Sequence, residues 1–77
     1  MLIGNRLNPN SVVNTDLVTD YFKGTKLNGT KPFVIYFGLS AAMSDNPVCV
    51  EWEFEKEEDR DAQWNNLMGA MSVQFFD

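Results

Sequence analysis

The chain has 77 residues, a formal net charge of −5, one cysteine and no histidine. This length predicts one domain, residues 1–77, and Cys49 alone excludes an intramolecular disulfide. Without histidine the commonest zinc ligand is missing, and an acidic balance argues against binding to nucleic-acid phosphates or anionic membranes. We therefore expect no metal, no cofactor, no nucleic-acid partner and no membrane partner.

The N-terminus lacks the basic region and long apolar stretch of a secretory leader. Together with the single cysteine, this predicts a protein of the cytoplasm, and the initial methionine predicts a complete small gene product. Charge is uneven along the chain: residues 1–44 carry +2 and residues 45–77 carry −7.

The first part of the chain predicts a strand, a turn and a helix. Residues 1–7 are short and fairly apolar, as in a strand, and residues 8–11, Asn-Pro-Asn-Ser, have turn chemistry. Four apolar residues then stand at i, i+1, i+4 and i+5, the spacing of one helical stripe: Leu17, Val18, Tyr21 and Phe22. We predict a helix near 12–23 that ends at Gly24.

Two strands and a connecting loop are predicted in the middle of the chain. Residues 33–39 are β-branched and aromatic, and they are apolar on both faces of a strand. Residues 48–54 alternate between apolar and polar side chains, which is typical of a half-buried strand. With the loop at 40–47, these strands predict an antiparallel hairpin.

A second helix is predicted after residue 56. Three acidic residues occupy its first turn, where the helix dipole favours anions: Glu57, Glu58 and Asp59. Four apolar residues follow at i, i+3, i+4 and i+7, the spacing of one buried stripe: Trp64, Leu67, Met68 and Met71. Residues 72–77 then predict a terminal strand.

The resulting order, β-α-β-β-α-β, is that of a ferredoxin-like α+β domain, with a four-stranded antiparallel sheet and two helices on one face. The other face of the sheet would be bare. Because residues 33–39 are apolar on both sides, this face needs cover of the kind that association provides. We expect a homodimer that forms through the sheet, with Val34, Tyr36 and Phe76 at the interface.

One segment also resembles a known family. It comprises Trp52-Glu53-Phe54-Glu55, the acidic Glu57-Glu58, then Arg60-Asp61-Ala62 and Trp64. Over residues 48–68 this pattern resembles dimeric α/β-barrel proteins of the NIPSNAP and antibiotic-monooxygenase type. The resemblance implies a homodimer whose sheets form a barrel, with a small-molecule cavity between sheet and helices. Some members are cofactor-free oxygenases and others degrade haem, but this chain has no histidine to ligate iron.

Few residues stand out as a site. Tyr36 and Trp52 are the candidate ligand-binding residues, although the sequence favours an interface for Tyr36 and a core for Trp52. No catalytic or metal-binding residue is predicted, because the acidic residues of 51–61 match no EF-hand spacing and suit a solvated surface. Arg60 and Asp61 are expected to form a surface ion pair.

The function we expect is non-enzymatic: a small acidic domain that homodimerises through its sheet, with a small apolar molecule as candidate ligand. One alternative is a cofactor-independent oxygenase-like enzyme, which requires a cavity of a few hundred Å³. A second alternative is an acidic inhibitor that imitates phosphates to bind a nucleic-acid enzyme. It requires the carboxylates of 51–61 on one exposed face.

Overall fold

Five strands, one short 3-10 turn and one helix make up the computed structural model, which describes residues 1–39 and 48–76. The elements are β1 (Leu2–Asn5), β2 (Asn8–Asn14), η1 (Thr15–Leu17), β3 (Val18–Thr25), β4 (Phe33–Leu39), β5 (Val48–Phe54) and α1 (Glu57–Ala70). The α+β class is confirmed. The loop predicted at 40–47 lies outside the described residues.

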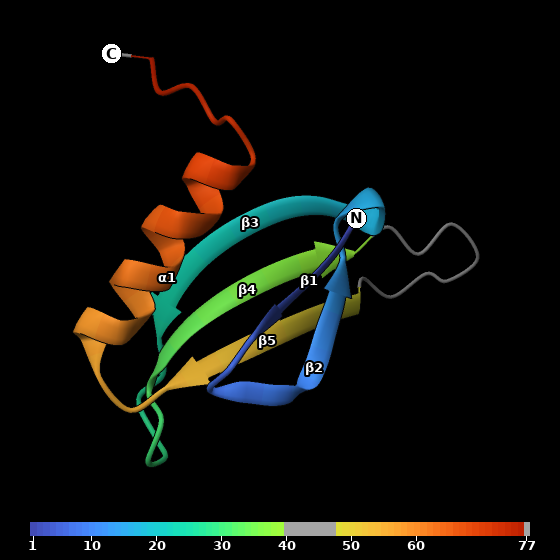
Figure 1. Cartoon of the computed structure of the whole chain (residues 1–77). Helices are drawn as coiled ribbons and strands as arrows, with labels where there is room; N and C mark the ends of the chain where they lie inside the picture. The colour runs from blue at the N-terminus through green and yellow to red at the C-terminus, as the bar shows by residue number, and fades with distance from the viewer. Residues whose placement is uncertain (40–47, 77) are drawn as a thin grey trace.

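The strands form two antiparallel sheets. β1 pairs with β2, and β3, β4 and β5 form a three-stranded sheet in that order. The predicted hairpin of β4 and β5 is confirmed, with Phe33 opposite Phe54 and Leu39 opposite Val48. Figure 1 shows α1 on one side of this sheet and the β1–β2 hairpin beside β5; α1 has its main contacts with β4 and β5.

The core lies on the sheet face that meets α1. Its buried members are Val13, Ile35, Phe37, Trp52, Phe54, Leu67 and Met68. The rings of Phe37 and Trp52 meet edge to face with centroids 4.7 Å apart, an arrangement that adds to the free energy of apolar burial.

Helix α1 forms where the sequence predicts it. Leu67 and Met68 of the predicted stripe are buried, and Trp64 and Met71 pack against the same core. No helix in the described part of the chain has the length and apolar character needed to cross a bilayer.

The opposite face of β4 is covered by the chain itself. Val34 points away from the core and yet is 0% exposed. Lys26 follows β3, and its Nζ reaches Glu51 and Glu53 on β5. Its methylene stem therefore crosses β4 and shields Val34, as long cationic side chains often do. The two apolar faces of β4 thus do not require a second copy, contrary to the reasoning from sequence.

The prediction of a helix near 12–23 is wrong. This segment forms the end of β2, the turn η1 and most of β3. Its helical spacing competes with a β-branched and aromatic composition that favours strands, in Val12, Val13, Thr15, Val18, Thr19, Tyr21 and Phe22. Pairing of β3 with β4 decides the outcome. The predicted arrangement of four strands and two helices is therefore wrong for the described residues.

The N-terminal strand is confirmed as β1, but the turn that follows is misplaced. It lies at residues 6–7, where Asn5 Oδ1 accepts a hydrogen bond from the Leu7 amide at 2.9 Å. An Asn side chain bonded two residues ahead is a turn-forming contact. The predicted turn residues 8–11 belong to β2 instead.

The prediction of a strand at 72–77 is wrong for the residues that the structure describes, 72–76. Ser72 adopts a left-handed φ of 55°, and the Val73 amide donates to Met68 O at 3.1 Å, which closes the end of α1. Residues 73–76 then extend without strand pairing, and Phe76 is 89% exposed.

One asparagine caps the outer edge of β5 at Glu53. Asn8 Oδ1 accepts from the Glu53 amide at 2.9 Å, and Asn8 Nδ2 donates to Glu53 O at 3.1 Å. The Trp52 indole donates to Ser11 O at 3.0 Å beside it. A single side chain thus occupies both outward main-chain groups of Glu53, which obstructs pairing of a further strand at this position.

We predict that Asn8→Ala lowers the free energy of unfolding by about 1–3 kcal/mol, because it leaves the part-buried main-chain groups of Glu53 unpaired. Urea denaturation measures the change. Asn10→Ala is the matched control: Asn10 is exposed on the same strand, and its loss should cost less than about 0.5 kcal/mol. Equal effects of the two substitutions would contradict the role given to Asn8.

Candidate association surface

The outer edge of β3 is open. β3 pairs with β4 alone, and no strand of the described residues flanks its other side. A bulge between Val18 and Asp20 interrupts the ladder with β4, so the regular part of β3 begins at Asp20. An unpaired strand edge is a template for another strand, and this edge lacks the cover that β5 has.

The hydrogen bonds of β3 show which of its main-chain groups point outward. The Lys26 amide donates to Pro32 O at 2.7 Å, so Lys26 directs its main-chain groups toward β4. This direction alternates along an antiparallel strand. Phe22 therefore also points its main-chain groups toward β4, whereas Tyr21 and Lys23 point theirs away from the sheet. Two N–H and two C=O groups are thus available at the centre of the edge.

Phe22 and Tyr36 form an aromatic pair beside this edge, on the sheet face away from α1. Their rings stack with centroids 4.8 Å apart and planes at 22°. Phe22 remains 48% exposed. Gly24 makes room for the pair, because a Cβ there would lie 3.0 Å from Tyr36 Cε2. An exposed aromatic next to an open edge is typical of association sites.

The same face carries a charged network. Lys26 Nζ lies 2.5 Å from Glu51 Oε2 and 3.9 Å from Glu53 Oε2. The hydrogen bond to Glu51 raises the pKa of Lys26 above its usual range; the charges of Glu51 and Glu53 add to this, and desolvation opposes it. Glu51 Oε2 is itself buried, so this ion pair is the contact that compensates its charge.

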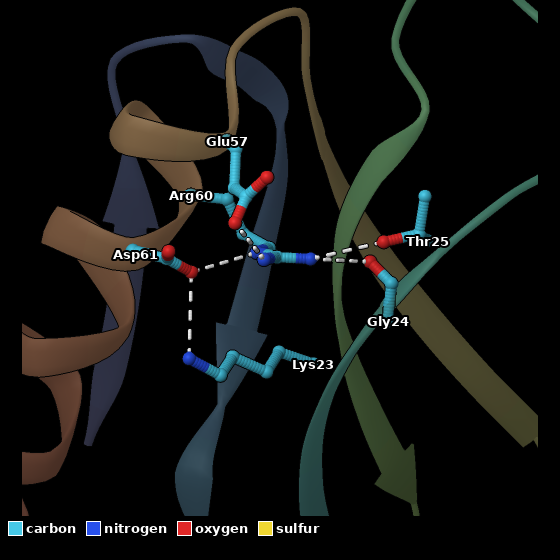
Figure 2. A network of polar contacts seen from close by, with 6 residues as sticks. All are labelled: Lys23, Gly24, Thr25, Glu57, Arg60 and Asp61. Carbon is cyan, nitrogen blue, oxygen red and sulfur yellow. Dashed lines mark hydrogen bonds and ion pairs between the residues drawn. The ribbon is translucent and has the colours of Figure 1, made fainter.

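Arg60 ties the start of α1 to the end of β3 (Figure 2). Its Nη1 donates to Gly24 O at 2.8 Å and its Nε donates to Asp61 Oδ1 at 2.9 Å. Arg60 is only 7% exposed. The predicted ion pair with Asp61 is confirmed, but its placement at the surface is wrong. Position 60 lies four residues before Trp64 and continues the buried stripe, a signal that the sequence already contains.

Asp61 links Arg60 to a third element. Lys23 Nζ lies 3.4 Å from Asp61 Oδ1, and the same ammonium stands 5.9 Å from the centroid of the Trp64 ring. The hydrogen bond from Arg60 holds the pKa of Asp61 below its ordinary value of 3.8, with Lys23 adding to the effect and desolvation opposing it. This network fixes the helix on the core face of β3 and leaves the strand's outer edge free.

The structure separates the two predicted ligand-binding residues. Tyr36 pairs with Glu51 and Trp52 pairs with Ile35, so their side chains lie on opposite faces of the sheet. Trp52 is fully buried and lines a hollow of about 250 Å³ between β1 and α1. Two further hollows, of about 190 and 280 Å³, adjoin Leu7, and Tyr36 lines none of the three. All are below the roughly 300 Å³ at which ligand pockets begin.

The predicted interface residues also lie apart. Val34 is buried inside the chain, Tyr36 is half-buried on the sheet face, and Phe76 is at the exposed C-terminal end. The sequence interpretation missed Phe22, because the predicted helix placed it in a buried stripe with Tyr21. Strand alternation puts the two on opposite faces.

The acidic residues of 51–61 do not form one free face. Glu51 and Glu53 are engaged by Lys26 on the sheet, and Asp61 by Arg60 on the core side. Within the part of the chain that the structure describes, no three potential metal-ligating side chains gather into a cluster.

No protein-family model, curated protein or solved structure matches this chain. The resemblance of residues 48–68 to dimeric α/β-barrel proteins stays a prediction.

We predict that Asp61→Asn changes how the free energy of unfolding depends on pH in the acidic range. Because the pKa of Asp61 is lowered on folding, its contribution is present above pH 3.8 and is lost as pH falls from there through the folded pKa. The free energies of unfolding of wild type and Asp61→Asn should therefore differ by a constant amount above about pH 5 and converge below about pH 4.

Urea denaturation between pH 7 and pH 2 measures both proteins. Glu55→Gln serves as control, because Glu55 is an exposed carboxylate that precedes α1 and has no ion pair in the described residues. It should follow wild type across the range. A difference between wild type and Asp61→Asn that stays constant down to pH 2 would refute the assigned role of Arg60.

Proposed function

We propose that this chain is an association module that works as a homodimer, formed through the β3 side of its β3–β4–β5 sheet, and not as a catalyst. The observation that supports this proposal is the contrast between the two edges of one sheet. Asn8 occupies the main-chain groups of Glu53 at the β5 edge, whereas the β3 edge is open and has the exposed ring of Phe22 beside it.

The size of the chain favours association. A domain of fewer than about 80 residues buries a modest share of its surface and gains stability from a partner subunit. Adding a strand to an open edge satisfies main-chain groups and buries neighbouring apolar side chains at the same time. At β3 these are the groups of Tyr21 and Lys23 and the ring of Phe22.

The charged network argues for contact at the edge and against contact between sheet faces. A barrel-type dimer would pack the face of Lys26, Glu51 and Glu53 against a second copy. Removing these charges from water carries a desolvation penalty that their attraction does not reliably recover. Contact along β3 leaves the network in solvent, and we therefore favour it over the barrel arrangement.

A small apolar ligand has a weaker basis. Of the three hollows, the one beside Trp52 combines apolar lining with the core side of α1. Its volume of about 250 Å³ limits it to a molecule smaller than the usual ligands of protein pockets. We assign it no part in the proposed function.

Light scattering after size-exclusion chromatography tests the proposal. The wild-type chain should have twice the mass of one chain at high concentration, and Phe22→Lys should shift it toward the monomer by placing an unpaired charge in the contact. Leu27→Lys is the matched control, since Leu27 is apolar and 99% exposed in the turn after β3. It should leave the mass unchanged. A wild type that stays monomeric up to millimolar concentration would end the proposal.

A further inference from the structure

We propose that the strand bound at the β3 edge is β3 of a second copy, antiparallel, with Phe22 on the two-fold axis. This inference rests on the proposed function and specifies its contact. A two-fold contact uses the same patch on both subunits, so β3 must be complementary to itself.

The main-chain groups satisfy this requirement. With Phe22 on the axis, Tyr21 lies opposite the partner's Lys23. Both residues direct their main-chain groups outward, so their N–H and C=O groups exchange hydrogen bonds in both directions. Phe22 then occupies a non-hydrogen-bonded position, where Cα atoms approach to about 4.5 Å and side chains are closest.

The side chains select this register over its neighbours. The two Phe22 rings meet on the axis, each already stacked on a Tyr36 at 4.8 Å, and the four rings form one row across the joined sheets. An axis at Tyr21 would set the Asp20 carboxylate against the partner's Phe22. An axis at Lys23 would place two ammonium groups opposite each other, which is destabilising.

The local charge fits a second copy of this chain. Residues 18–25 contain one acid, Asp20, and one base, Lys23, so the edge is neutral in a chain of net charge −5. Two β3 edges can therefore approach without like-charge repulsion between them. In this register Asp20 lies opposite the partner's Gly24, which has no side chain to obstruct it. The partner's Lys26 is the diagonal neighbour of Asp20 on the same face of the joined sheet.

Disulfide trapping tests the register, in the Cys49→Ser background because Cys49 is exposed. Phe22→Cys should cross-link within minutes in a glutathione redox buffer, because both thiols lie at the axis within disulfide distance. Asp20→Cys is the control on the same face of the same strand. Its two Cα atoms would lie about 13 Å apart along the strands, too far for a disulfide.

Amide hydrogen exchange of the wild-type chain provides a second test that leaves Phe22 in place. The amides of Tyr21 and Lys23 should exchange at least tenfold more slowly when the concentration is raised above that of dimer dissociation, while the Leu27 amide stays unchanged. Dimers in light scattering whose Asp20→Cys variant cross-links as fast as Phe22→Cys would overturn the register and leave the proposed function standing. Dimers in which the Tyr21 and Lys23 amides stay unprotected would overturn both, because no strand is then bound at the β3 edge. If the chain stays monomeric under all conditions, both the register and the proposed function are overturned. The same holds if an extended peptide of another protein, and not a second copy, protects the β3 edge.

Discussion

The structure depends on how β4 is covered, because a strand of seven residues that is apolar on both faces must be shielded on both. On one face α1 and the hairpin of β1 and β2 supply the core. On the other face the stem of Lys26 crosses β4 while its ammonium stays with Glu51 and Glu53, and the ring of Phe22 stacks on Tyr36. This second cover is thin and charged at its end. This face of the sheet therefore combines a charged network over β4 and β5 with a half-exposed aromatic ring, Phe22, at the β3 edge.

Two polar side chains then decide which edge stays open. Asn8 draws the hairpin onto β5 by bonding both main-chain groups of Glu53, and Arg60 holds the start of α1 to Gly24 at the far end of β3. Both contacts join elements that are distant in sequence. Each one uses main-chain atoms of the contacted residue, Glu53 or Gly24, and therefore does not depend on that residue's side chain. With the hairpin committed to β5 and the helix packed on the core face of the sheet, no strand of the described residues remains to pair with the outer edge of β3.

The sequence predicts the elements whose local pattern and tertiary environment agree. The strands at β4 and β5 and the helix α1 have unambiguous composition or periodicity, and each is buried on the face that the pattern indicates. Residues 12–23 fail because helical spacing and strand propensity conflict there, and only pairing with β4 resolves the conflict. The open edge and Phe22 could not be predicted once that segment was assigned to a helix. Arg60 shows the reverse case, since its position in the stripe marked it for burial although its charge suggested the surface.

An open edge also raises the question of where assembly would stop. A sheet that adds strands at both edges grows into a fibre, whereas one that adds at a single edge closes after one step. Here the joined sheet would present two β5 strands at its outer edges, and in each the main-chain groups of Glu53 are already bonded to Asn8 of the same chain. The bulge between Val18 and Asp20 restricts the ladder further to the short segment around Phe22. The contact of Asn8 with Glu53 thus disfavours further strand addition at β5, so the association that we propose through β3 would be limited to two copies.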